Sequence, residues 1–166
     1  GEPMKHTISI LVENHAGVLS RISGLFARRG FNIDSLAVGV TNDPTISRIT
    51  IVVDGNEYIV EQVEKQLNKL IDVIRLRRLK EDEKVSRELV LVKVECSPKT
   101  RSDIIDIVRV MDAKVSDLSK TTLTAELSAQ TEKIELFCEL LEPYHILEVA
   151  RTGTIALDKG DATLTA

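Results

Sequence analysis

Hydrophobic and polar positions along the chain follow two periods, one of two residues and one of three to four. Stretches that are rich in β-branched residues and in which polar and apolar residues alternate are typical of strands. Apolar residues that recur every three or four positions are typical of amphipathic helices. Turn-forming residues separate these stretches. In the first half they predict a strand at residues 6–12, a helix from 18 that Gly30 ends, strands at 33–40 and 46–53, a helix from 57, and a strand at 73–79.

The second half repeats the same order of elements after a charged linker at residues 80–84. Its first strand contains the most continuously apolar run of the chain, LVLVKV. The final segment is rich in Gly, Thr and Ala and is expected to be extended or mobile. The pattern predicts a strand at residues 88–94, a helix after 97–99, strands at 113–118 and 121–127, a helix at 132–141 that Pro143 ends, a strand at 146–149, and the extended segment from 152.

Each half therefore has the order β-α-β-β-α-β. This order predicts the ferredoxin-like arrangement, an antiparallel four-stranded sheet with two helices on one face. The expected fold class is α+β, with ferredoxin-like domains at residues 4–80 and 85–161 and a tail at 162–166. Because helices cover only one face, the other face of each sheet and its edge strands are expected to remain available to another chain.

Composition narrows the class of function. The 166 residues are 43% hydrophobic and 29% charged, a balance typical of ordered globular domains. A net charge of -4 and an aromatic content of 3% disfavour nucleic acid as a partner. One basic cluster at residues 75–80 is followed by the acidic run 81–83, and the two are interpreted as a solvated strand end and linker.

The compartment is predicted from what the sequence lacks. Cys96 and Cys138 are far apart and share no metal-binding spacing, which fits a reducing cytoplasm. No apolar stretch approaches the roughly 20 residues that span a membrane, and nothing at the start is typical of a signal peptide. A cytoplasmic protein without membrane contact is therefore expected.

Catalytic constellations are not found. Of the three histidines, His6 and His145 are interpreted as surface or packing residues, and no phosphate loop, nucleophile elbow or metalloprotease motif occurs. Asp103 and Asp106 are three residues apart on a predicted helix, a spacing common on solvated faces. We expect no catalytic residue, no metal site and no cofactor.

The turn from the first strand into the first helix, ENHAGVL at residues 13–19, is the most informative segment. A helix N-terminus offers unpaired N–H groups and partial positive charge to a carboxylate. Gly17 would let a ligand approach that backbone, and Asn14 and Asn32 could supply amides for a zwitterion. Ordinary turn and capping roles for the same residues remain the alternative.

Longer strings carry a resemblance to a known family. ILVENHAGVLSRISGLFARRGFNIDSL, DPTISRITI and VEQVEKQLNKLIDV resemble the small regulatory subunit of acetohydroxyacid synthase, also called acetolactate synthase, which begins with an ACT domain. In the second half, ELVLVKV and VARTG are similar to the same family. The resemblance extends from about Met4 to Asp161, and it implies that the first ferredoxin-like domain is an ACT domain that binds an amino acid.

The resemblance also implies a function. Such subunits form homodimers, activate a catalytic large subunit and confer feedback inhibition by valine in branched-chain amino acid biosynthesis. Thiamine diphosphate, flavin and magnesium would belong to the large subunit, and this chain would bind none of them. The valine contacts carried over to this sequence are Asn14, His15, Ala16, Gly17 and Val18 of one chain with Asn32 and Ile33 of the other.

Three other interpretations remain open. An ACT-type sensor for a different amino acid or enzyme partner would share both the fold and the loop. A ferredoxin-like nucleic-acid module would need aromatic residues on the central strands, and residues 6–12 and 46–53 contain no Phe, Tyr or Trp. A stand-alone enzyme is disfavoured because no catalytic constellation is found, although fold alone does not decide function.

Overall fold

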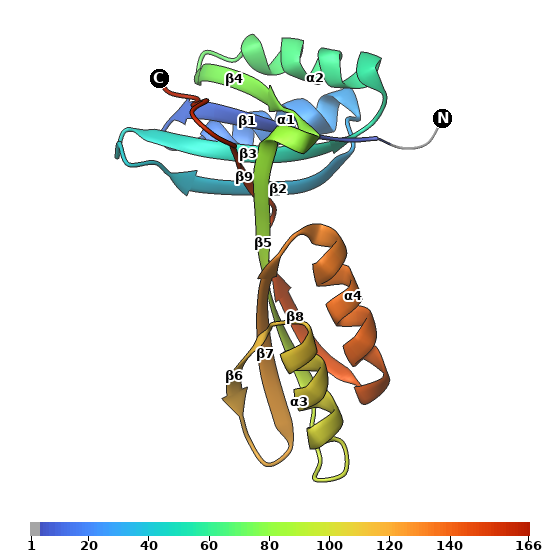
Figure 1. Cartoon of the computed structure of the whole chain (residues 1–166). Helices are drawn as coiled ribbons and strands as arrows, with labels where there is room; N and C mark the ends of the chain where they lie inside the picture. The colour runs from blue at the N-terminus through green and yellow to red at the C-terminus, as the bar shows by residue number, and fades with distance from the viewer. Residues whose placement is uncertain (1–3) are drawn as a thin grey trace. The chain divides into compact units, whose positions relative to one another are not determined.

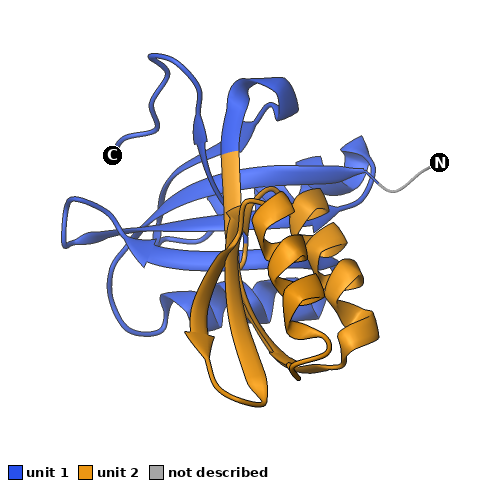
Figure 2. Ribbon diagram, turned by 60° about the horizontal axis from the view of Figure 1, so that its bottom comes forward, with its two compact units in different colours: residues 1–85, 154–166 blue, residues 86–153 orange. Residues whose placement is uncertain are grey.

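The protein, described here from a computed structural model of residues 4–166, divides into two compact units. Unit 1 combines the N-terminal part of the chain up to Val85 with Thr154–Ala166, and unit 2 is Ser86–Gly153 (Figure 2). The sequence pattern predicts that residues up to 161 belong to the second domain. In the structure the chain returns to unit 1 at Thr154 instead.

Unit 1 has the predicted β-α-β-β-α-β order, and its sheet is antiparallel with strand order β2-β3-β1-β4. Figure 1 shows the helices α1 and α2 on the same side of this sheet. Gly30 ends α1 with a left-handed φ of 67°, as the helix-stop signal predicts. The elements are β1 (Lys5–Glu13), α1 (Val18–Arg29), β2 (Ile33–Val40), β3 (Ile46–Asp54), α2 (Glu57–Asn68) and β4 (Val73–Leu79).

The core of unit 1 lies between the sheet and its two helices. On β1, Ile8, Ile10 and Val12 point into this core, since strand side chains alternate between the faces. They pack with apolar residues of β3 and of both helices, and all of these are at most 6% exposed: Ile49, Ile51, Val53, Ile22, Leu25, Phe26, Val60, Val63 and Leu67. Aliphatic side chains supply most of this core, which agrees with an aromatic content of 3%.

The centre of the opposite face of the first sheet is covered, contrary to the sequence-based expectation. Thr7, Ser9 and Leu11 alternate with the core residues of β1 and are nevertheless at most 3% exposed. The segment Thr154–Ala166 returns to unit 1 (Figure 1) and contains the short strand β9 (Ile155–Asp158). The end of the chain, expected to be extended or mobile, is therefore partly a strand.

Side chains of the sheet hold this C-terminal segment in place. Arg77 on β4 donates to Asp158 at 2.5 Å and to the backbone oxygen of Thr163 at 3.0 Å. Arg48 on β3 donates to the backbone oxygen of Leu164 at 3.3 Å, and the N–H of Thr154 donates to Ser35 Oγ at 2.8 Å. The basic strand end of β4, interpreted from sequence as solvated, thus contributes an ion pair to unit 1.

Unit 2 repeats the fold of unit 1. Its sheet has the order β6-β7-β5-β8, which corresponds strand for strand to β2-β3-β1-β4. Helices α3 and α4 lie on one face, around a core that includes Val92, Ile134 and Phe137. The 3-10 turn η1 (Glu81–Glu83) and the first two residues of β5 (Lys84–Glu95) still belong to unit 1. The elements of unit 2 are the rest of β5, α3 (Arg101–Val110), β6 (Lys114–Leu118), β7 (Thr122–Ala129), α4 (Thr131–Leu141), η2 (Glu142–Tyr144) and β8 (Ile146–Arg151).

The structure confirms the α+β class and the two ferredoxin-like repeats. The predicted linker at residues 80–84 is a single 3-10 turn that leads directly into β5, which is longer than the predicted strand. Within residues 4–166, no helix is long and apolar enough to cross a membrane.

Candidate functional site

The loop between β1 and α1 is held against the turn between β2 and β3. The backbone N–H of Asn14 donates to the oxygen of Thr45 at 2.8 Å, and Asn14 Nδ2 donates to the oxygen of Pro44 at 2.9 Å. Because the amide nitrogen of Asn14 faces Pro44, its Oδ1 points away from that contact. An exposed Oδ1 is a suitable acceptor for an ammonium group.

Gly17 is the N-cap residue of α1 and has a φ of 90°, a left-handed conformation that favours glycine. It gives the helix no side-chain cap, and the first turn of α1 contains no acidic residue. At the start of α2, by contrast, Asn56 accepts from the N–H of Ile59 and Glu57 lies in the first turn. The N–H groups at the start of α1 are therefore suited to a carboxylate from outside the helix.

The neighbouring site residues lie on both sides of this helix start. His15 and Ala16 are exposed in the loop, whereas the side chain of Val18 is 5% exposed and belongs to the core. A ligand at this site would therefore meet the backbone of Val18 rather than its isopropyl group. The loop residues Asn14–Gly17 are all exposed and follow one another directly before α1.

Asn32 and Ile33 lie at the other end of the same sheet. Ile33 pairs with Val53, near the end of β3, whereas Glu13 pairs with Ile46 at its beginning. Nine residues of β1 separate the two ends, a distance of about 26 Å at 3.3 Å per residue. One ligand cannot contact both groups in a single chain, so a site that contains all seven residues needs a second copy.

A buried carboxylate contacts residues of the loop between β1 and α1. Asp72, in the connection from α2 to β4, is 2% exposed. Its oxygens accept from Arg21 Nε at 2.6 Å and Arg21 Nη2 at 3.0 Å, and His15 Nε2 lies 3.1 Å away. The backbone oxygen of Asp72 also accepts from the N–H of Glu13 at 3.1 Å. Asp72 thus joins β1, the loop and α1.

This network shifts two pKa values. Hydrogen bonds from Arg21 are the largest cause that lowers the pKa of Asp72, although its burial acts in the opposite direction. The pKa of His15 is raised above 6.5, first by the hydrogen bond to the backbone oxygen of Ala16 and then by Glu13 and Asp72. Both shifts favour the charged forms.

Glu13, His15 and Asp72 also present three possible metal-ligand atoms within 4.8 Å of one another. Both oxygens of Asp72 already accept from the guanidinium of Arg21, which places a positive charge beside them. That charge would repel a divalent ion, and the geometry is better explained as an ion-pair network. The sequence pattern predicts neither Arg21 nor Asp72 as a site residue, since no local pattern links positions so far apart.

Comparison with known proteins identifies the family. The model described as "AHAS small subunit-like ACT domain" matches residues 8–75, and the model "Small subunit of acetolactate synthase" matches residues 87–160. The chain belongs to the acetolactate synthase small-subunit family. It is accordingly a regulatory small subunit with an ACT domain, and not a catalytic chain.

Individual relatives agree over nearly the whole chain. The "Acetolactate synthase small subunit" of Mycolicibacterium smegmatis is 50% identical over 155 residues, which cover 93% of this chain and 91% of the relative. The "Probable acetolactate synthase small subunit" of Archaeoglobus fulgidus is 46% identical over 158 residues, covering 95% and 99%. The crystal structure of the acetolactate synthase small subunit from Thermotoga maritima superposes with a TM-score of 0.90 at 35% identity, covering 96% of this small subunit and 99% of that chain.

Proposed function

We propose that this small subunit binds valine at the start of α1 and thereby controls the catalytic large subunit of acetolactate synthase. The observation that carries the proposal is the N-terminus of α1 at Gly17, which has neither a side-chain cap nor an acidic first turn. The proposal includes two effects on the large subunit, which are activation by this small subunit and feedback inhibition by valine. It also includes a cytoplasmic location for the small subunit.

The chemistry of the loop suits a zwitterion. The valine carboxylate accepts from the N–H groups at the start of α1, where the helix dipole is positive. The ammonium group donates to the carboxamide oxygen of Asn14 and, across the interface, to Asn32 of a second copy. Ala16 and Ile33 of the second copy offer apolar surface to the isopropyl group.

The position of Asn32 and Ile33 supports a homodimer. They lie about 26 Å from the loop within one chain, and β2, which begins at Ile33, is an edge strand of its sheet. Two copies that meet along this edge would complete two equivalent sites, as a twofold interface requires. A ligand held by both chains shifts the equilibrium between two packings of the dimer only if it binds one packing better. The large subunit would respond to that shift.

Calorimetric titration of valine into the purified small subunit tests the proposal. We expect saturable binding of valine and none of serine, and at least a tenfold weaker affinity in Asn32→Ala, equivalent to about 1.4 kcal/mol. Asn68→Ala makes the same change at an exposed position on α2 and should bind valine normally. Leucine and isoleucine in the same experiment separate a valine sensor from an ACT-type sensor for another amino acid.

Activity of the reconstituted enzyme provides the second readout. Small subunit added to large subunit should raise acetolactate formation, and valine should lower it again. If valine neither binds to the small subunit alone nor affects the reconstituted enzyme, the proposal is wrong.

Protonation of His15 should make valine binding depend on pH. The groups that face His15 are Glu13, Asp72 with its partner Arg21, and the oxygen of Ala16, and together they raise its pKa above 6.5. The imidazolium present below that pKa adds positive charge beside the bound carboxylate, and this charge is lost as the pH rises through it. Valine affinity should therefore fall, by about threefold, as the pH rises above the His15 pKa.

The variant His15→Gln should bind valine with little dependence on pH over the same range. The measurement is the dissociation constant at several pH values between about 6 and 9. A wild-type dissociation constant that stays constant, or that falls as the pH rises, would show that His15 does not act on the ligand in this way.

A further inference from the structure

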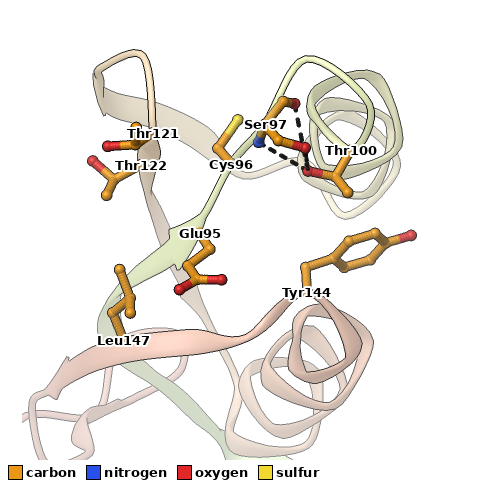
Figure 3. A pocket seen from close by; sticks show the side chains of 8 residues that line it. All are labelled: Glu95, Cys96, Ser97, Thr100, Thr121, Thr122, Tyr144 and Leu147. Atoms are coloured by element: carbon orange, nitrogen blue, oxygen red, sulfur yellow. Dashed lines mark hydrogen bonds between the residues drawn. The ribbon is translucent and has the colours of Figure 1, made fainter.

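Unit 2 has a cavity of its own at the end of β5. Its volume is about 470 Å³, and Figure 3 shows around it side chains from the strands β5, β7 and β8, from the start of α3 and from the connecting segments. The lining residues are Glu95, Cys96, Ser97, Thr100, Thr121, Thr122, Tyr144 and Leu147.

The cavity occupies the place in unit 2 that the β1–α1 loop occupies in unit 1. It lies where the first strand of the repeat leads into the first helix, between the strand that corresponds to β3 and the connection to the strand that corresponds to β4. Glu95 ends β5 as Glu13 ends β1. His145 comes just before β8, as Asp72 comes just before β4.

The charged and polar groups that line the cavity indicate which class of ligand it could bind. Glu95 is the single ionisable carboxylate among the lining residues, and neither Lys nor Arg lines the cavity. The remaining polar groups are the hydroxyls of Ser97, Thr100, Thr121, Thr122 and Tyr144, which can both donate and accept. Such a lining favours a small ligand with a positively charged donor for Glu95 and polar groups for the hydroxyls.

The carboxylate of Glu95 is held in position. His145 Nδ1 lies 3.0 Å from Glu95 Oε1, and the N–H of Glu95 donates to the backbone oxygen of His145 at 3.0 Å. His145 has a φ of 71°, a left-handed conformation that residues other than glycine rarely adopt. Unusual backbone conformations of this kind cluster at binding sites, where the surrounding structure enforces them.

The other side of the cavity is ordered and partly apolar. Ser97 and Thr100 bond to each other across the turn before α3, because the N–H of Ser97 donates to Thr100 Oγ1 at 3.0 Å. In Figure 3, Leu147 and the ring of Tyr144 lie on opposite sides of Glu95. An ammonium group at Glu95 would therefore have both hydroxyl groups and apolar surface for a short side chain around it.

We propose that unit 2 binds a free amino acid in this cavity, with the ammonium group of the ligand at Glu95. This second site does not depend on valine binding to unit 1. Its occupancy would give the small subunit an input separate from the proposed valine site.

Amide NMR spectra of the full-length, ¹⁵N-labelled small subunit test this site. The probes are the twenty proteinogenic amino acids at about 10 mM, and isovalerate, which resembles valine but lacks the ammonium group. We expect at least one amino acid to shift the signals of residues 95–97, 99, 100, 121, 122 and 144–147 with saturation, and isovalerate not to shift them.

Two variants test whether binding depends on the charge of Glu95. Glu95→Gln removes the charge but keeps the shape, and should weaken binding at least tenfold. Glu132→Gln makes the same change at an exposed position on α4 and should leave binding unchanged. The proposal is overturned if no amino acid shifts those signals, or if Glu95→Gln binds as well as the wild type. Shifts confined to residues 14–18 and 32–33 would overturn it and leave the valine proposal intact.

Discussion

Replacing Gly17 with aspartate is expected to give a folded small subunit that no longer responds to valine. The new carboxylate would lie at the start of α1, where it can accept from the same N–H groups as the carboxylate of valine. A Cβ at position 17 would also come within 3.0 Å of Arg21 Nη1, the movable end of a long side chain. We expect valine affinity to fall at least 100-fold, equivalent to about 2.7 kcal/mol.

Stability should change little in Gly17→Asp, because two effects oppose each other. The φ of 90° is unfavourable for aspartate, whereas an aspartate N-cap and its charge stabilise a helix start. Activation of the large subunit should therefore be retained. Calorimetry with valine and inhibition of the reconstituted enzyme are the two measurements.

The matched control is Gly160→Asp. Gly160 has a φ of 70°, and a Cβ added there would meet nothing within 4 Å beyond its chain neighbours. The variant therefore has a similar backbone penalty and the same new charge away from the loop. It should bind valine as the wild type does. Equal valine inhibition of Gly17→Asp and Gly160→Asp would contradict the assignment of the site to the start of α1.

Replacing Asp72 with asparagine should both weaken valine binding and lower the melting temperature. Asparagine keeps the size of the side chain but removes the charge that Arg21 and His15 contact from α1 and from the loop. Without that charge, Arg21 no longer has its ion-pair partner beneath Gly17, and the loop is less firmly fixed. We expect about a tenfold loss of valine affinity and a fall in melting temperature on the order of 5 °C.

The pH dependence of the Asp72 effect has a definite sign. The folded state lowers the pKa of Asp72, so the stabilisation by its charge is present above the unfolded-state pKa of about 3.9 and is lost as the pH falls. Wild type and Asp72→Asn should therefore differ in melting temperature at pH 7 and converge in acid. A constant difference at all pH values would mean that packing, rather than charge, is what the variant loses.

Asp106→Asn is the control for this experiment. Asp106 is exposed on α3, and the same replacement there should change neither the melting temperature nor valine binding. If Asp72→Asn behaves like Asp106→Asn, Asp72 has no role in positioning the loop.

Local sequence signals predicted most of the secondary structure because their causes are local. Gly30 ends α1 because glycine adopts the left-handed conformation without steric cost, and the turn at residues 41–44 joins β2 and β3 as its Asn-Asp-Pro composition predicts. The alternation of Ile8 and Ile10 with Thr7 and Ser9 predicted a strand, and Ile8 and Ile10 belong to the core beneath the helices. The same periodicities in the second half predicted the repeat.

Tertiary structure decided what covers the other face of the first sheet. Composition alone indicated an extended or mobile end, because Gly, Thr and Ala carry no strong periodic signal. The contact from Arg48 to Leu164 joins residues 116 positions apart, and no local pattern can indicate such a pair. Polar residues such as Thr7 and Ser9, which sequence periodicity places on an open face, are therefore buried.

The candidate site also depends partly on local sequence and partly on tertiary structure. The sequence by itself determined the fold class and indicated the loop at residues 14–17 as a candidate site for a carboxylate, since both depend on neighbouring residues and on backbone chemistry. The structure alone showed that Asp72 lies beneath the loop, 51 positions from its partner Arg21, and that Asn32 lies at the far end of the sheet. Such placements depend on how distant segments pack, because strand pairing and core formation bring together residues that no local spacing relates.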